Sequence, residues 1–346
     1  MARKRKRPLI FVCDLTPGTT VDSCFFLRQI APNAGNGPKL RARIWDRTGE
    51  AALIVWEWDP RVALADGPYR VVGTVGTYAG SVQVCADRLE ACPLEADLME
   101  LLPAAPRPIA AMWADLERLC AGCGSPPLRA LFNLILADQA LCERWQQAPA
   151  AVRHHHAYLG GLLEHSLGVA RVALAIADHY PALDRDLLLA GALLHDLGKT
   201  EAYRIQGTPD MTDQGRLLGH VYPGAYLVHR FIERLPDFPP ELRDRLLHLI
   251  GSHHGERQFG VLEVPKTPEA VVLHYADNVD AKLSAVFAAC QQANGQAWTA
   301  PVRSLQDERV FVGSGNAAPA MPDPGTLDLL DDPFQGSLFA CDDPDA

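Results

Sequence analysis

The sequence predicts two folded parts, a small closed β-barrel at the N-terminus and an all-α domain behind it. Three observations predict this arrangement. Residues 8–92 contain short segments that alternate between apolar and polar side chains and are separated by turn residues. Residues 127–298 carry Ala, Leu and Val at helical spacing. Eleven of the 12 histidines lie between His154 and His254, inside the predicted helical part.

The N-terminal part contains five candidate strands, at residues 21–30, 39–46, 51–56, 69–77 and 81–89. In the second strand the apolar residues take one face, and Arg41, Arg43 and Trp45 take the other, because successive strand side chains point to opposite faces. Five short strands in succession are typical of the OB-fold, a small barrel that binds oligonucleotides. We therefore expect residues 8–92 to form an OB-fold whose Arg41, Arg43 and Trp45 bind nucleic acid.

The remaining chain changes from strand to helix spacing. Helices are predicted at residues 127–147, 159–179, 186–197, 218–235, 239–252 and 268–292. The proline-rich start of residues 93–126 predicts a linker that leads into a connecting helix. Residues 299–346 are rich in Gly, Pro, Ala and Asp, which predicts an acidic and partly disordered tail.

The composition excludes several classes of protein. With 48% hydrophobic and 21% charged residues, the chain is neither disordered nor collagen-like. It has no apolar run long enough to cross a bilayer, and nine cysteines are too few for a disulfide scaffold. Its basic start is not followed by an apolar region and a cleavage site, so a secretory signal is not expected. A cytoplasmic enzyme without a membrane partner is expected. The net charge of −10 disfavours nucleic-acid binding by the chain as a whole, but the acidic residues crowd the tail and a basic run occupies residues 3–7.

Histidines and aspartates recur in an order that favours a metal site. His195 and Asp196 end an apolar helical run, and further candidate ligands stand before and after them: His165, His220, His253, His254 and Asp277. Imidazole nitrogens with a few carboxylates and no clustered thiolates suit a first-row divalent ion. An aspartate beside a histidine can bridge two ions, and two ions about 3.5–4 Å apart clamp a phosphate.

Five strings carry a resemblance to a known family: HHAY at residues 155–158, GGLLEH at 160–165, LHDLGK at 194–199, GH at 219–220 and SHHG at 252–255. Their order resembles the HD superfamily of metal-dependent phosphohydrolases. With a barrel in front, the chain is similar to the YhaM-type 3′→5′ exoribonucleases, which couple an OB-fold to an HD domain. The resemblance covers roughly residues 10–290.

The resemblance implies a two-metal centre. His165, His195, Asp196 and Asp277 would hold the first ion, and Asp196 would bridge to a second ion held also by His220 and His253. The family implies Mn²⁺, and Fe, Co, Ni and Zn are the alternatives. Asp280 is the rival ligand to Asp277.

The resemblance also implies a reaction, in which a metal-bound hydroxide attacks the terminal phosphodiester and a nucleoside monophosphate leaves. Lys199 would offset charge on a phosphate oxygen, and His254 would be either a further ligand or the proton donor to the leaving 3′ oxygen. The expected activity is a divalent-metal-dependent 3′→5′ exonuclease acting on single-stranded RNA, with DNA as an alternative substrate.

Two other functions stay open at this point. One is a phosphohydrolase of nucleotides or cyclic dinucleotides, for which an OB-fold would be superfluous. The other is a nucleic-acid-binding accessory factor with incidental hydrolysis. The sequence also leaves open whether the chain forms a homo-oligomer.

Overall fold

The computed structural model describes residues 9–33, 36–37, 39–59, 61–62, 64–93, 96–152, 156–206 and 208–313. The basic run at residues 3–7, His155 of the HHAY string and the tail from residue 314 onward lie outside these ranges. The chain divides into two compact units. The first comprises Met1–Ala105 with Arg204–Asp210, and the second comprises Pro106–Tyr203 with Met211–Ala346. The division falls inside the predicted linker, residues 93–126.

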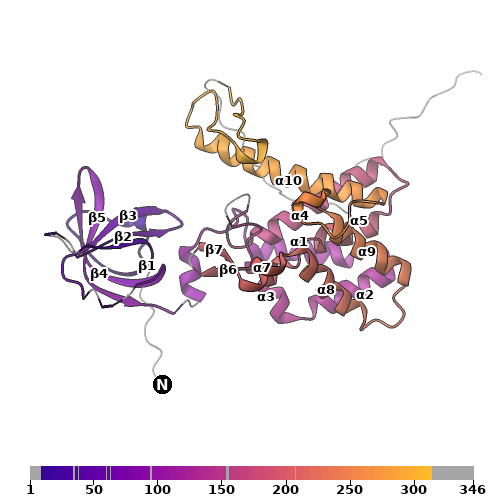
Figure 1. The fold of residues 1–346 in the computed structure, drawn as a ribbon, viewed down its shortest axis with the longest axis horizontal. Helices are drawn as coiled ribbons and strands as arrows, with labels where there is room; N and C mark the ends of the chain where they lie inside the picture. Colours follow the sequence, from indigo (N-terminus) through magenta and orange to yellow (C-terminus); the bar gives the residue numbers. More distant parts are fainter. Residues whose placement is uncertain are drawn as a thin grey trace, which may run out of the picture. The chain divides into compact units, whose positions relative to one another are not determined.

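The first unit contains a closed five-stranded barrel (Figure 1). Its strands are β1 (Thr20–Pro32), β2 (Leu40–Asp46), β3 (Gly49–Val55), β4 (Gly67–Tyr78) and β5 (Ser81–Ala91). They follow the order β1-β2-β3-β5-β4, with β4 returning to β1, and β3 and β5 form the parallel pair. Each strand overlaps one of the five predicted strands, so the predicted OB-like barrel is confirmed.

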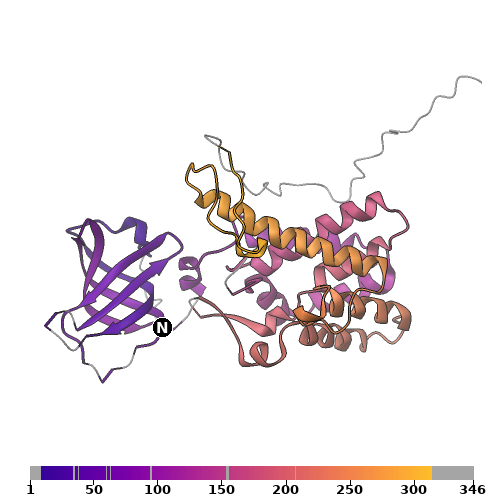
Figure 2. The same ribbon diagram turned by 45° about the horizontal axis from the view of Figure 1, so that its top comes forward.

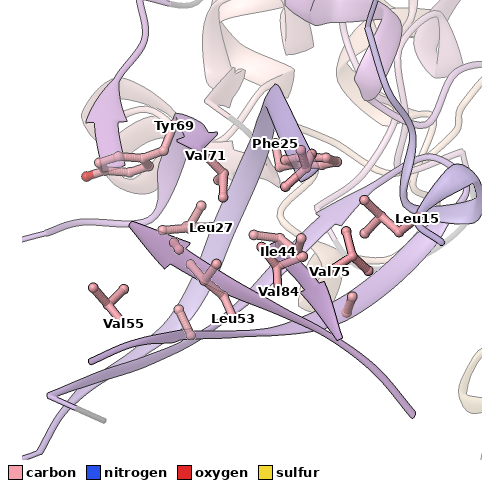
Figure 3. Packing of buried hydrophobic residues seen from close by; sticks show 14 of the residues in the cluster. Leu15, Phe25, Leu27, Ile44, Leu53, Val55, Tyr69, Val71, Val75 and Val84 are labelled. Atoms are coloured by element: carbon pink, nitrogen blue, oxygen red, sulfur yellow. The ribbon is translucent and has the colours of Figure 1, made fainter. Parts of the chain in front are cut away.

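Alternate side chains from all five strands fill the inside of the barrel (Figure 3). The best buried of them are at most 1% exposed: Phe25, Leu27, Leu40, Ile44, Leu53, Val71, Val75 and Val84. A register shift between β4 and β5 lies at Val72 and Gly73. A Cβ on Gly73 would lie 2.1 Å from the Cys85 carbonyl oxygen, so the two strands approach this closely only because Gly73 has no side chain.

The outer face of β2 differs from the predicted basic and aromatic surface. The alternation is as predicted, but Trp45 is only 8% exposed, because its ring stacks on Phe26 at 5.1 Å between centroids and the Arg28 guanidinium covers it at 5.7 Å. Arg43 forms an ion pair with Glu50 at 2.7 Å. Of the three predicted contacts, Arg41 alone is exposed in the described barrel. A role of Trp45 in stacking nucleobases stays a prediction, and it requires Arg28 to move away.

The second unit is helical, as predicted (Figures 1 and 2). Its helices are α1 (Ile109–Ala121), α2 (Pro126–Leu136), α3 (Gln139–Gln147), α4 (Gly161–His179), α5 (Arg185–Leu194), α6 (Lys199–Ala202), α7 (Asp213–Leu218), α8 (Val221–Ile232), α9 (Pro240–Ser252) and α10 (Pro268–Gln292). Helix α4 packs against α5 and α10. Two helices, α2 and α3, replace the single predicted helix at 127–147, because Asp138 caps a new helix by accepting a hydrogen bond from the Leu141 N–H.

A short hairpin interrupts the helices. Strands β6 (Tyr203–Gln206) and β7 (Thr208–Met211) follow α6 directly and were not predicted. Four-residue strands are too short to show a period in the sequence. None of the described helices has the length and apolarity that crossing a membrane requires.

Candidate metal centre

The predicted ligands stand on segments of the second unit that converge. His195 caps the C-terminus of α5 and is followed by Asp196. His220 lies at the N-terminal cap of α8, and His253 caps the C-terminus of α9. Of the other two, His165 lies within α4 and Asp277 within α10. The structure brings all six side chains together.

Asp196 lies at the middle of the group, and its two carboxylate oxygens face different histidines. Oδ2 is 3.3 Å from His195 Nε2 and 3.4 Å from His165 Nε2. Oδ1 is 3.1 Å from His220 Nε2 and 3.6 Å from His253 Nε2. A carboxylate placed between two sets of imidazoles has the form of a ligand that bridges two cations.

Asp277 belongs to the side of His165 and His195. Its Oδ1 lies 3.2 Å from His165 Nε2. One ligand atom from each of His165, His195 and Asp277 falls within 4.8 Å of the others, and the same holds for His195, Asp196 and His253. These distances are compatible with atoms that share a cation.

The buried histidines are oriented from their far ring nitrogens. The Nδ1–H of His195 donates to Ala192 O at 2.9 Å, and the Nδ1–H of His253 donates to Ile250 O at 2.7 Å. A neutral imidazole carries a proton on only one nitrogen, so the Nε2 lone pair of each ring faces the centre. The helix ends therefore supply both the position and the tautomer of these side chains.

Three buried atoms at the centre make no well-aligned hydrogen bond with a described residue, although the first two lie 3.1 Å apart: Asp196 Oδ1, His220 Nε2 and His253 Nε2. Buried polar atoms are nearly always paired, because leaving them unpaired costs about 1–3 kcal/mol each. A divalent cation would satisfy all three atoms. The donor set therefore fits the divalent metal that the sequence predicts.

The electrostatics keep most of these groups in the form that binds a metal. Burial lowers the pKa of His253 well below its ordinary value, and the neighbouring His254 and His195 lower it further. Burial also lowers the pKa of His220. For Asp196, burial acts to raise the pKa, but Lys199 and His195 outweigh it and hold the pKa well below its ordinary value. Neutral imidazoles and ionised carboxylates are the forms that coordinate cations.

His165 is the exception among the histidines. Its burial acts to lower the pKa, but hydrogen bonds with Asp196, Asp277 and Asp280 outweigh it, so its pKa stands well above the ordinary value. Without a cation, His165 is therefore protonated at neutral pH. A metal binding at its Nε2 has to displace that proton.

Lys199 lies closer to the centre than expected. It is 7% exposed, and its Nζ donates to Asp196 Oδ2 at 2.5 Å. Burial acts to lower the pKa of Lys199, but Asp196 outweighs it and raises the pKa. In this arrangement Lys199 neutralises Asp196, and a contact between Lys199 and a phosphate stays a prediction.

A second layer of side chains surrounds His165, and the sequence reasoning largely missed it. Asp280 accepts from the His165 Nδ1–H at 2.7 Å, while Asp277 approaches Nε2 of the same ring. His156 Nε2 lies 3.4 Å from Asp280 Oδ2, and its Nδ1 lies 3.1 Å from Glu164 Oε2. The signal available in the sequence was the spacing of the two aspartates, since residues three apart lie on one face of a helix.

His254 lies at the edge of the centre. Its Nδ1–H donates to Phe259 O at 2.9 Å, and its ring centroid is 5.0 Å from that of His220. His220, His253 and His254 form a further group whose ligand atoms fall within 4.8 Å of one another. Both predicted roles of His254, as a ligand and as a proton donor, therefore stay open.

Comparisons with known proteins agree with this geometry. The family model described as "HD domain" matches residues 162–282, and one described as "Putative helicase" matches residues 128–185. A Bacillus licheniformis protein named "3'-5' exoribonuclease YhaM" is 30% identical over 284 residues, which cover 80% of this chain and 89% of that protein. The Bacillus subtilis protein of the same name is 29% identical over 301 residues, covering 85% and 95%.

A solved structure, the HD domain of the L. monocytogenes phosphodiesterase PgpH, is 22% identical and covers 42% of this chain and 73% of that one. Its TM-score of 0.27 is too low for the two folds to be compared.

The barrel, the HD domain and the cluster of imidazoles and carboxylates define a metal-dependent hydrolase of the HD superfamily. Sequence identity over most of both chains makes the assignment more specific. The chain belongs to the YhaM family.

Proposed function

We propose that this chain is a divalent-metal-dependent 3′→5′ exonuclease that shortens single-stranded RNA and releases nucleoside monophosphates. The observation that carries the proposal is Asp196, whose two oxygens face two separate pairs of histidines. The relatives named 3'-5' exoribonuclease support the polarity and the substrate. The OB-like barrel supports an oligonucleotide over a free nucleotide.

The proposed ligands divide into two sets that share Asp196. The first ion would be held by His165, His195, Asp196 and Asp277, and the second by Asp196, His220 and His253. Manganese is the proposed metal because the resemblance to the YhaM family implies it, and the carboxylates of the set suit it. When bound, such ions supply charge neutralisation on the phosphoryl oxygens and a lowered pKa for water.

The chain itself contributes orientation and a dry environment. The helix carbonyls at Ala192 and Ile250 fix His195 and His253, and burial of Asp196 excludes bulk water from its carboxylate. We assign His254 as the proton donor to the leaving 3′ oxygen, because it is partly exposed beside His220. Because its Nδ1–H is hydrogen-bonded to Phe259 O, the donated proton would be carried at Nε2, by a ring that is protonated on both nitrogens.

The barrel is proposed to hold the upstream part of the strand. Arg41 is exposed, and Arg43 is half-buried in its ion pair with Glu50. Cations of this kind bind phosphates through a salt-dependent release of counterions. Trp45 would add stacking if Arg28 moved off its ring.

The test is incubation of the full chain with 5′-labelled single-stranded RNA and Mn²⁺. We expect a ladder that shortens from the 3′ end, with mononucleotides as the other product. His195→Ala should lose both the ladder and the bound metal. RNA of constant length, under a metal shown to bind, would contradict the proposal.

Three further substrates separate the rival functions. A DNA oligonucleotide of the same sequence reports the sugar preference. Turnover of mononucleotides or a cyclic dinucleotide without shortening of RNA would favour the small-molecule phosphohydrolase. Binding of RNA that the His195→Ala variant retains, with no hydrolysis by either protein, would favour the accessory factor.

A further inference from the structure

The proposed function uses no residue of the HHAY string at residues 155–158, although the described part of the string lies next to the metal centre. His156 is 3% exposed, and its ring centroid is 5.9 Å from that of His165. A polar side chain buried to this degree is held by partners, because its ring nitrogens have lost their contact with water. The contacts of His156 therefore indicate what the buried ring contributes.

The ring of His156 lies between two carboxylates. Its Nε2 is 3.4 Å from Asp280 Oδ2, and its Nδ1 is 3.1 Å from Glu164 Oε2. Tyr158 completes the group: its Oη lies 2.7 Å from the same Nδ1 and donates to Glu164 Oε2 at 2.5 Å. The ring therefore links Asp280, on α10, to Glu164 in the first turn of α4.

The charges of the three groups support one another. Burial acts to lower the pKa of His156, but Asp280 and Glu164 outweigh it and raise the pKa. Burial acts to raise the pKa of Asp280, but His156 and His165 outweigh it and lower the pKa. A protonated imidazole can donate from both nitrogens, so one ring serves both carboxylates and offsets their mutual repulsion.

The backbone at His156 is held in a conformation that residues other than glycine rarely adopt, with a φ of 53°. Its carbonyl oxygen accepts from the Ala150 N–H at 3.1 Å. A Cβ at Gly161 would lie 2.0 Å from the same oxygen, so the turn packs this closely on the first residue of α4 only because Gly161 has no side chain. Strained backbone persists where the surrounding structure holds it, and it gathers at functional sites.

Asp280 connects this turn to the metal centre. The oxygen that faces His156, Oδ2, also accepts the His165 Nδ1–H at 2.7 Å. Its other oxygen, Oδ1, lies over Gly168, where a Cβ would come within 2.1 Å. The direction of His165 Nε2 follows from the hydrogen bond at Nδ1, so whatever fixes Asp280 also fixes His165.

We propose that His156 is a positioning residue of the metal centre, which holds the Asp280 carboxylate behind His165 and so keeps His165 Nε2 facing Asp196. The inference rests on the proposed function in taking the six predicted ligands as a metal site, and it adds a residue outside that set. Glu164 and Tyr158 hold the far side of the His156 ring. His156 itself acts only through Asp280 and touches neither metal nor substrate.

The first test measures the affinity of the full chain for Mn²⁺ by titration calorimetry. His156→Ala should bind Mn²⁺ about tenfold more weakly, because Asp280 loses the group that holds it. His156→Gln should keep most of the affinity, because its amide nitrogen can take the place of Nε2 and donate to Asp280. The matched control is His179→Ala, a change of an exposed histidine at the C-terminal end of α4, which should bind as the wild type.

A double-mutant cycle tests whether His156 acts through Asp280. Once Asp280 is removed, the change at His156 should have no further effect. The double variant His156→Ala with Asp280→Ala should therefore bind Mn²⁺ as weakly as Asp280→Ala alone. Losses that add up in the double variant would show that His156 supports the fold by another route, and they would overturn the proposal.

Kinetics with single-stranded RNA at saturating Mn²⁺ separate positioning from substrate binding. His156→Ala should keep the wild-type KM for RNA. A raised KM at unchanged Mn²⁺ affinity would make His156 a substrate contact, and an unchanged KM at unchanged affinity would leave it without a role at the centre. Either result would overturn the inference and leave the exonuclease standing. A wild-type chain that binds no Mn²⁺ would overturn both, and one that binds Mn²⁺ without shortening RNA would overturn the exonuclease alone.

Discussion

The imidazole of His165 donates its Nδ1–H to Oδ2 of Asp280 at 2.7 Å. The same ring meets Asp277 at Nε2, so one helix, α10, supplies a carboxylate to each side of one imidazole. Asp280 lies over Gly168, where a Cβ would come within 2.1 Å of its Oδ1. A carboxylate behind a metal-binding histidine fixes the ring and makes its other nitrogen a better ligand.

Removal of this carboxylate should weaken metal binding. We expect Asp280→Ala to lower the affinity for Mn²⁺ about 10–100-fold, measured by titration calorimetry. Gly168→Ala should lower it in the same direction by displacing Asp280, although it removes no polar group. The control is Asp178→Ala. Asp178 lies on the same helix as Gly168, and this change breaks only its exposed ion pair with Arg185. Equal metal affinity in all variants would show that Asp280 does not orient His165.

Metal binding should release a proton at neutral pH. Three aspartates hold the pKa of His165 well above its ordinary value, so the metal-free ring is protonated and Nε2 has no free lone pair. The affinity for Mn²⁺ should therefore rise with pH until the pH passes the pKa of His165. Calorimetry in two buffers of different ionisation enthalpy counts the released protons. A count near zero at pH 7 would contradict a protonated His165.

Lys199 should stabilise the metal-free protein more than the metal-bound protein. Without a cation it is the buried partner of Asp196, and removing one member of a buried ion pair costs about 3–5 kcal/mol. We expect Lys199→Met to lower the free energy of unfolding by about that amount in EDTA and by less with saturating Mn²⁺. Urea unfolding of the full chain measures both. Lys282→Met, at an exposed position on α10, should change neither value.

The barrel offers a matched pair of glycines on one strand. A Cβ at Gly73 would overlap the Cys85 carbonyl, whereas at Gly76 the nearest atom is Gln83 O at 4.0 Å. Gly73→Ala should therefore destabilise the barrel by about 1–3 kcal/mol, and Gly76→Ala should be nearly neutral. Thermal unfolding followed by circular dichroism compares the two. Equal melting temperatures would mean that β4 can shift away from β5 at little cost.

The spacing of apolar residues and the turn residues between segments predicted most of the fold. In β2 the inward residues Leu40, Ala42 and Ile44 lie in the barrel core, because alternation is a local property of the strand. The hairpin at Tyr203–Gln206 and Thr208–Met211 was missed because its strands are too short to show alternation. The burial of Trp45 depends on Arg28 and Phe26 of the neighbouring strand, and a single strand carries no information about that pairing.

At the candidate site, the residue types and their order predicted which side chains come together. They did not predict what orients them. Asp277 and Asp280 are equivalent in the sequence as acids on one helix, and only the packing of α4 against α10 assigns them to opposite nitrogens of His165. Lys199 was predicted to contact a phosphate oxygen. Its contact with Asp196 was not predicted, because it depends on the tight turn after α5.

Gly198 and Gly224 allow the start of α8 to pack closely against the turn after His195, because neither has a side chain. A Cβ at Gly198 would lie 2.1 Å from the His220 carbonyl oxygen, and one at Gly224 would lie 3.0 Å from the Gly198 nitrogen. A single methyl group at Gly198 would push His220 outward and separate it from Asp196. The sequence would nevertheless still contain every ligand residue of the cluster. Loss of catalysis in a natural variant of this protein can therefore arise at a position that has no chemistry of its own, and an inventory of intact ligands would not reveal it.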